Sequence, residues 1–124
     1  MKSYKNLKIF ITGINGFKGT WLALFLKKCG AKVSGIGLKE DNSEIFKKLL
    51  SNKIDFKHLN ILNKNELEQI IKKKKPDIIF HLAAQSIVSE SYENPVNTFQ
   101  TNVIGSANIL EITKNLNIPA LVYI

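Results

Sequence analysis

The sequence contains no arginine, although it is strongly basic. All 18 basic residues are lysines, and they exceed the 10 acidic residues enough to give a formal net charge of +8. Arginine is the residue that binds guanine edges and phosphates through paired hydrogen bonds. The densest lysine run, residues 72–75, falls where a helix is expected to end, and cations there complement the helix dipole. We therefore expect a solvated helix end and no nucleic-acid partner.

Cysteine and long apolar runs are also scarce. The one cysteine, Cys29, excludes an internal disulfide framework and is typical of a reducing compartment. No apolar stretch is long enough to span a bilayer. The apolar part of the first residues is too short for a signal peptide and runs directly into a glycine turn. We expect a cytoplasmic protein with no membrane partner, and no metal site is predicted.

Length and composition limit the chain to a single domain. Its 124 residues suffice for a hydrophobic core, and 44% hydrophobic with 23% charged residues is ordinary for a globular protein. The sequence shows no internal repeat, no low-complexity tract and no linker. Residues 1–124 are therefore interpreted as one domain.

Three glycines, Gly13, Gly16 and Gly19, stand between two apolar segments of different period. Residues 7–12 are β-branched and aromatic, as in a buried strand. The segment after the glycines has apolar residues at helical spacing, and Gly30 is suited to end that helix. The apolar residues of this helical pattern are Phe17, Trp21, Leu24 and Phe25. The order predicted is strand, glycine turn and helix.

This order gives the glycines a specific use. A helix N-terminus offers unpaired N–H groups and partial positive charge, which suit a phosphate. In a dinucleotide site of this kind Gly13 forms the tight turn, Gly16 admits the pyrophosphate, and Gly19 lets the helix pack closely. A glycine pattern alone is also compatible with a purely structural turn.

Strand and helix patterns alternate along the rest of the chain. Further strands are predicted at 31–38, 54–59, 78–82 and 120–124. The helices predicted between them are a short one capped by Ser43 or Asn42 and ending near Leu50; one capped by Asn63 with Glu66 and facing inward through Leu67, Ile70 and Ile71; and one carrying Val96, Phe99, Val103, Ala107 and Leu110.

The alternation predicts an α/β fold. A doubly wound parallel sheet of Rossmann type, with the strand order 3-2-1-4-5 and helices on both faces, satisfies it. A sheet of this kind normally continues to a sixth strand. We therefore expect a chain truncated in or after its fifth strand, the front part of a longer protein.

Four stretches carry a family resemblance: residues 12–19 (TGINGFKG), 59–63 (LNILN), 80–85 (FHLAAQ) and 101–111 (TNVIGSANILE). Together they resemble the N-terminal half of an extended short-chain dehydrogenase/reductase that acts on nucleotide sugars. Residues 17–21 (FKGTW) and 91–95 (SYENP) are most similar to the CDP-glucose 4,6-dehydratases. Residues 83–86 (AAQS) are shared with the GDP-mannose 4,6-dehydratases. The resemblance covers essentially the whole chain.

The resemblance implies roles for individual residues in binding a dinucleotide. The three glycines and the backbone of Phe17 and Lys18 correspond to the pyrophosphate site. Asn60 and Ile61 stand where the family has an Asp-Ile pair that contacts adenine, and an amide in place of the Asp can still donate and accept hydrogen bonds. The residues that correspond to the nicotinamide side are Ala83, Ala84 and Gln85, with Asn102 near the active site.

The catalytic residues of the family are not predicted in this chain. The family uses a Ser/Thr and a Tyr-x-x-x-Lys pair, in which the lysine lowers the pKa of the phenol. Tyr4 and Lys8 have this spacing, but Tyr4 precedes the first predicted strand and Lys8 belongs to it, so no helix presents the pair. His81 ends a strand and is interpreted as a core histidine. The family's Ser/Thr would follow Ile124.

The resemblance further implies cofactor, substrate and assembly. An NAD enzyme has an acid after the second strand. Lys39 stands at that position and suits the 2′-phosphate of NADP, but the carboxylate of Glu40, which follows it, favours NAD, with NADP the less favoured cofactor. The implied activity is that of an NAD-dependent CDP-glucose 4,6-dehydratase, a homodimeric lyase of polysaccharide biosynthesis with a nucleotide-sugar substrate. A GDP-mannose 4,6-dehydratase, a nucleotide-sugar 4-epimerase and a non-catalytic dinucleotide-binding module remain as alternatives.

Overall fold

A parallel sheet forms the centre of the protein. The computed structural model describes residues 3–39 and 43–124, and in these residues the sheet has 5 strands in the order β3-β2-β1-β4-β5. All four neighbouring pairs are parallel. The strands are β1 (Lys8–Thr12), β2 (Lys32–Gly37), β3 (Asp55–His58), β4 (Ile78–His81) and β5 (Ala120–Tyr123). The predicted doubly wound topology and strand order are confirmed.

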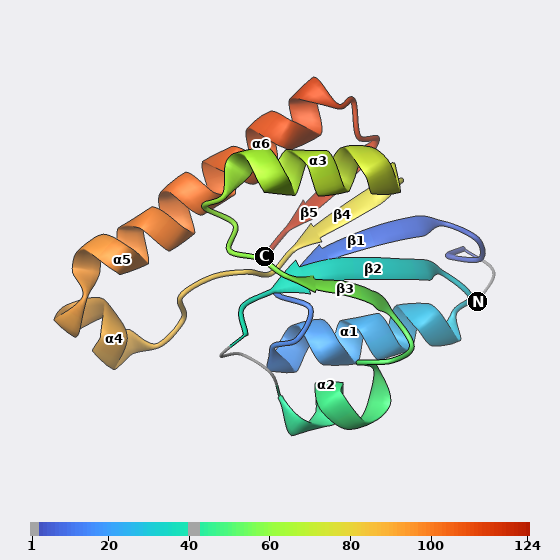
Figure 1. Ribbon diagram of the computed structural model, residues 1–124, viewed down its shortest axis with the longest axis horizontal. Helices are drawn as coiled ribbons and strands as arrows, with labels where there is room; N and C mark the ends of the chain where they lie inside the picture. The colour runs from blue at the N-terminus through green and yellow to red at the C-terminus, as the bar shows by residue number, and fades with distance from the viewer. Residues whose placement is uncertain (1–2, 40–42) are drawn as a thin grey trace.

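Helices cover both faces of this sheet. Two of them, α1 and α2, lie on one face, while α3 and α6 lie on the other (Figure 1). The described helices are α1 (Phe17–Lys28), α2 (Glu44–Leu49), α3 (Lys64–Lys74), α4 (Val88–Glu93), α5 (Pro95–Phe99), the π-helical η1 (Gln100–Gly105) and α6 (Ser106–Asn115). No helix in the described part of the chain is long and apolar enough to cross a membrane.

The central strand β1 contributes to two hydrophobic layers. Successive side chains of a strand point to opposite faces. Ile9 and Ile11 accordingly pack in the layer under α1 and α2, whereas Phe10 packs in the layer under α3 and α6. All three side chains are fully buried. This two-sided burial fixes β1 at the centre of the sheet, so that the glycine turn after Thr12 opens at its middle.

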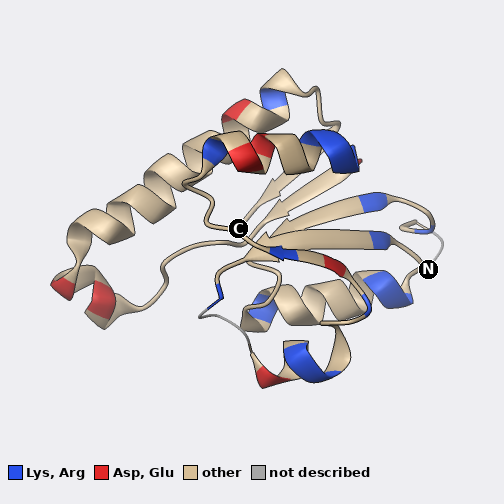
Figure 2. Cartoon of the chain, in the orientation of Figure 1, with Lys and Arg blue, Asp and Glu red and all other residues tan. Residues whose placement is uncertain are grey.

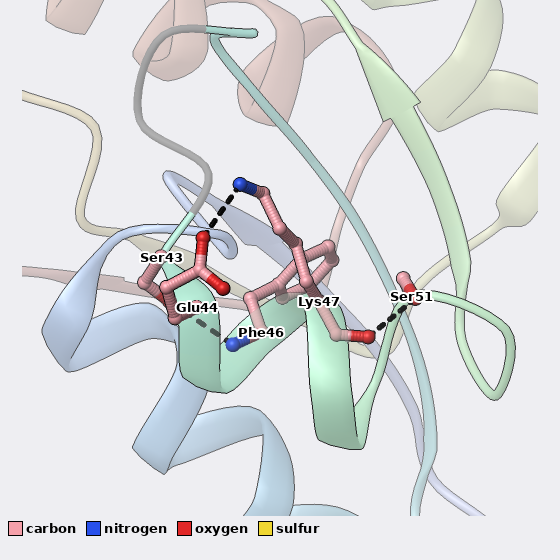
Figure 3. A network of polar contacts seen from close by, with 5 residues as sticks. All are labelled: Ser43, Glu44, Phe46, Lys47 and Ser51. Carbon is pink, nitrogen blue, oxygen red and sulfur yellow. Dashed lines mark hydrogen bonds and ion pairs between the residues drawn. The ribbon is translucent and has the colours of Figure 1, made fainter.

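The helix ends follow the predicted capping residues. Ser43 caps α2 by accepting a hydrogen bond of 3.1 Å from the Phe46 N–H, and a Glu44–Lys47 ion pair lies on the same turn (Figure 3). Gly30 follows α1 with φ = +85°, a conformation that glycine adopts easily. Asn63 caps α3 by accepting from the Glu66 N–H. The alternative cap, Asn42, lies outside the described residues.

Two details of the helices were not predicted. The aromatic row of α1 faces solvent, with Phe17 70% exposed, because Gly19 and Ala23 form the face that packs on the sheet. The segment before β5 is also more complex than one helix. It adds α4, which the sequence did not indicate, and the π-helical turn η1 interrupts the long helix.

Candidate functional site

The glycine turn joins the end of β1 to the start of α1. Gly13 has φ = +70°, and a Cβ there would lie 2.9 Å from the Ala83 nitrogen, so the tight turn requires glycine. Gly16 is the N-cap of α1 and offers no side chain to the first N–H groups of the helix, and the first turn has no acidic residue. The N–H groups at this helix start are therefore left for another acceptor.

A pocket of about 600 Å³ opens at this helix start. It lies at the carboxyl ends of the strands, where ligands of open α/β sheets bind. Lys18 is the one charged residue among the described residues that line it. The lining residues are Gly13, Gly16, Phe17, Lys18, Gly19, Ile36, Gly37, Leu38, Leu59, Asn60, Ile61, Leu82, Ala83, Ala84, Ser86, Thr101 and Ile124. Size, apolar walls and positive charge suit an elongated anionic ligand.

The predicted site residues gather at this pocket with three exceptions. Gln85 and Asn102 do not line it but lie directly beside it, bonded to each other. Glu40 lies outside the described residues. The sequence reasoning missed the walls formed by the ends of β2 and β4, of which Gly37 and Leu82 are examples. Their position after predicted strands was the available signal.

One end of the pocket is formed by the loop after β3. The Asn60 side-chain oxygen accepts a hydrogen bond of 2.9 Å from the Leu62 N–H. The Asn108 side chain donates to the Ile61 carbonyl at 3.0 Å, and the Ile61 side chain fills the space beside Gly105, where a Cβ would meet it at 2.4 Å. Helix α6 and η1 thus hold this loop in place.

The opposite end is formed by the loop after β4. The Asn102 side chain accepts from the Gln85 N–H at 2.8 Å and donates to the Gln85 carbonyl at 2.9 Å. The Gln85 side chain bonds Thr98 at 2.9 Å and the backbone of Ile87. This loop is therefore tied to the long helix that follows it. Asn102 supports the wall of the pocket in this structure.

Below the pocket lies a chain of buried hydrogen bonds centred on His81. The imidazole is 1% exposed, with Nδ1 2.7 Å from the Thr12 hydroxyl and Nε2 3.1 Å from the Ser106 hydroxyl. The Ser106 hydroxyl lies 3.0 Å from that of Tyr123. Burial lowers the pKa of His81 to about 4. The interpretation of His81 as a core histidine is confirmed. The two hydroxyls bonded to it, and the Tyr123 hydroxyl bonded to Ser106, were not anticipated, since they come from separate elements.

The buried imidazole predicts a pH-dependent stability. The His81 pKa is lower in the folded protein than the usual 6.5, so the unfolded chain binds more protons between these values. The contribution of His81 to the free energy of unfolding is then fully present above pH 6.5. It falls by about 3 kcal/mol as the pH decreases toward 4. Urea unfolding between pH 4 and 7 measures this slope.

Two variants isolate the contribution of the buried histidine. His81→Asn should show a shallower decrease of unfolding free energy with pH than the parent protein. His58→Asn is the matched control, because it makes the same substitution at an exposed position. Equal slopes in the parent and in His81→Asn would contradict the assignment.

The fold and pocket define a Rossmann-like α/β domain. The sequence profile of the family described as GDP-mannose 4,6 dehydratase matches residues 10–123. The chain belongs to this family of nucleotide-sugar dehydratases and epimerases. The predicted family resemblance is thereby confirmed.

Individual relatives include both types of enzyme. The chain is 39% identical over 124 residues to a CDP-glucose 4,6-dehydratase of Salmonella typhimurium, covering 98% of this chain and 34% of that protein. It is 33% identical over 113 residues to a UDP-glucose 4-epimerase of Mycoplasma genitalium, covering 90% of this chain and 33% of that protein. The chain therefore spans about a third of the length of these relatives.

Solved structures agree in fold. An epimerase of Methanothermobacter thermautotrophicus superimposes with a TM-score of 0.86 at 27% identity, covering 98% of this chain and 36% of that one. The enzyme WbmH of Bordetella bronchiseptica, solved in complex with NAD⁺, has a TM-score of 0.79 at 29% identity and covers 94% of this chain and 38% of that one. Both likenesses cover nearly the whole of the present chain.

Proposed function

We propose that residues 1–124 are the cofactor-binding portion of an NAD-dependent nucleotide-sugar 4,6-dehydratase that acts on CDP-glucose. The uncapped start of α1, opening onto the pocket beside Lys18, is the observation that carries the cofactor proposal. Similarity to the Salmonella CDP-glucose 4,6-dehydratase supports the choice of reaction and substrate. Bound NAD supplies a hydride acceptor and donor in such a dehydration.

The residues present fit a dinucleotide along the pocket. A Cβ at Gly16 would meet only the Gly13 carbonyl at 3.4 Å, so this position is open toward the pocket and gives a phosphate room to approach the backbone. Phe17 and Lys18, the first two residues of α1, line the same space. We assign the adenine end to Asn60 and Ile61, and the nicotinamide end to the loop after β4.

Catalysis is proposed to require residues outside this chain. Lys8 is the first residue of β1 and lies at the amino end of the sheet, away from the pocket at the carboxyl ends. The Tyr4–Lys8 pair is therefore not a catalytic Tyr-x-x-x-Lys motif. The 124-residue chain should bind the dinucleotide weakly and convert no sugar nucleotide.

A product analysis tests the reaction. CDP-glucose is incubated with NAD and either the 124-residue chain or the longer protein that contains it, and products are identified by mass spectrometry. The proposal expects loss of one water with the longer protein only. Dehydration by the short chain would contradict it.

A 4-epimerase is the second candidate, favoured by the UDP-glucose 4-epimerase relatives and structures. Incubation of the longer protein with NAD and UDP-glucose, followed by chromatographic separation of the products, distinguishes it. An epimerase would convert the sugar nucleotide to an isomer of equal mass, whereas a dehydratase forms a lighter 4-keto-6-deoxy product. A longer protein that binds NAD but converts neither CDP-glucose, GDP-mannose nor UDP-glucose would favour a non-catalytic module.

We propose NAD rather than NADP as the cofactor. Lys39 is exposed directly after β2, and the carboxylate of Glu40, one residue further, would accept the ribose hydroxyls and repel a 2′-phosphate. The longer protein should bind NAD more tightly than NADP, and Glu40→Ala should weaken NAD binding while Lys39→Ala does not. Titration calorimetry with both cofactors measures this. Tighter NADP binding that is lost in Lys39→Ala would overturn the choice.

We also propose that the longer enzyme is a homodimer. The long helix, formed by α5, η1 and α6 in succession, carries no charged residue from its start at Pro95 to Leu110 (Figure 2). It exposes an apolar row consisting of Val96, Phe99, Val103, Ile104 and Leu110. Exposed apolar patches promote association. This face is then covered in the intact assembly.

The 124-residue chain should therefore self-associate as its concentration rises. Sedimentation velocity measures the effect, and the double variant Phe99→Glu/Val103→Lys should reduce it. Trp21→Glu is the matched control, since Trp21 is equally apolar and half-exposed but lies on the opposite face of the sheet. A stable monomer at high concentration would contradict this assignment.

A further inference from the structure

The hydrogen bonds around Ser106 leave one consistent placement of protons. The Ser106 hydroxyl lies 2.7 Å from the Asn102 carbonyl, which can only accept, so Ser106 donates there. Its single hydrogen is then used, and it must accept from both His81 Nε2–H and the Tyr123 hydroxyl. His81 is therefore the neutral tautomer protonated on Nε2, and Nδ1 accepts from the Thr12 hydroxyl.

Two arms lead from His81 to the loop after β4. In the first, the Thr12 oxygen that donates to His81 also accepts from the Ala83 N–H at 3.1 Å. In the second, Ser106 bonds the carbonyl of Asn102, and the Asn102 side chain holds both backbone groups of Gln85. Both arms end on residues 83–85, which flank the pocket opposite the loop after β3.

The second arm passes through the π-helical turn. Asn102 lies within η1, and its carbonyl accepts a hydrogen bond from the Ser106 hydroxyl. In a regular α-helix the same carbonyl would accept from the Ser106 N–H. Serine side chains that bond the carbonyl four residues earlier distort helices, and π-turns are frequent at functional sites. Removal of this hydroxyl should let the turn relax and displace Asn102 from Gln85.

We propose that His81, acting through Thr12 and Ser106, positions residues 83–85 for the nicotinamide half of the dinucleotide. The inference rests on the proposed NAD site. Thr12, His81 and Ser106 are positioning residues, because they are bonded to the loop rather than placed to touch the ligand. Their loss should weaken contacts at the nicotinamide end and leave those of the adenosine and pyrophosphate unchanged.

Comparison of two ligands tests this division. ADP-ribose shares every part of NAD except the nicotinamide, so the ratio of the two dissociation constants isolates that end. Ser106→Ala should raise the Kd for NAD by about fivefold to tenfold, the effect of losing one buried hydrogen-bond centre. The same substitution should change the Kd for ADP-ribose by less than about twofold. Titration calorimetry on the 124-residue chain gives both values.

Thr113→Val is the matched control. Thr113 lies on the same helix and its hydroxyl bonds the Ile109 carbonyl at 2.7 Å, four residues earlier, but Ile109 belongs neither to η1 nor to the loop after β4. It should leave both dissociation constants unchanged. Should Ser106→Ala not fold, Thr12→Val removes the hydroxyl of the other arm and is expected to give the same selective loss.

The outcomes separate this inference from the proposed function. Equal weakening of NAD and ADP-ribose, or no preference of the parent protein for NAD over ADP-ribose, would overturn the positioning role while leaving the dinucleotide site in place. Failure of the parent protein to bind either ligand would overturn the site and the inference with it. A selective loss of NAD affinity supports both.

Discussion

Replacement of Gly16 by valine is expected to abolish dinucleotide binding without unfolding the protein. The backbone at Gly16 has φ = −72° and ψ = 174°, which valine adopts readily, and a Cβ there makes an ordinary contact of 3.4 Å. The added methyl groups would stand in the pocket at the start of α1, where the phosphates are placed. We expect the Kd for NAD to rise by at least about 100-fold.

Calorimetric titration and the far-UV circular dichroism spectrum measure the two parts of this prediction. Gly16→Ala is the graded control, because one methyl group fills less of the pocket and should weaken binding less than valine does. A Gly16→Val protein that binds NAD as tightly as the parent would mean that the phosphates do not approach this helix start.

The same substitution three residues later should instead abolish the fold. A Cβ at Gly19 would lie 2.1 Å from the Gly13 carbonyl oxygen and 2.7 Å from the Ile14 Cα. Both are backbone atoms of the turn after β1, so neither can move without displacing the central strand or α1. We expect Gly19→Val to destabilise the protein by more than about 4 kcal/mol, a loss that exceeds the effect of most single substitutions.

Urea unfolding followed by circular dichroism measures this loss. Gly16→Val is the matched control, since it adds the same side chain to the same turn and should retain a cooperative transition near that of the parent. A folded Gly19→Val protein of parental stability would contradict the close packing of α1 on the turn. Gly16 thus leaves room for the ligand, whereas Gly19 leaves room for α1 to pack on the turn.

Local chemistry explains why the strand order and the helix caps were predictable. The glycine turn, Gly30 after α1 and Ser43 before α2 each satisfy a requirement set by a few neighbouring residues. Alternation of strand and helix patterns then leaves few parallel topologies. These features depend on short-range sequence, and the structure has them where the sequence placed them.

Features that depend on distant contacts were not predictable in the same way. Helical spacing identifies α1 but does not show that Gly19 and Ala23, rather than Phe17, face the sheet. That choice follows from the close approach of the helix to the turn. The hydroxyls of Thr12 and Ser106 meet His81 only through folding, since they come from β1 and α6.

Mapping of NAD binding by ¹⁵N–¹H correlation spectroscopy tests the dinucleotide site most directly. The amide signals of residues 13–19, 60–61 and 83–85 should shift together in one saturable process as NAD is added to the 124-residue chain. ADP-ribose should reproduce the shifts of the first two groups and not those of residues 83–85. Shifts confined to other surfaces, such as the lysine run at 72–75, or no shifts at saturating NAD, would contradict the account.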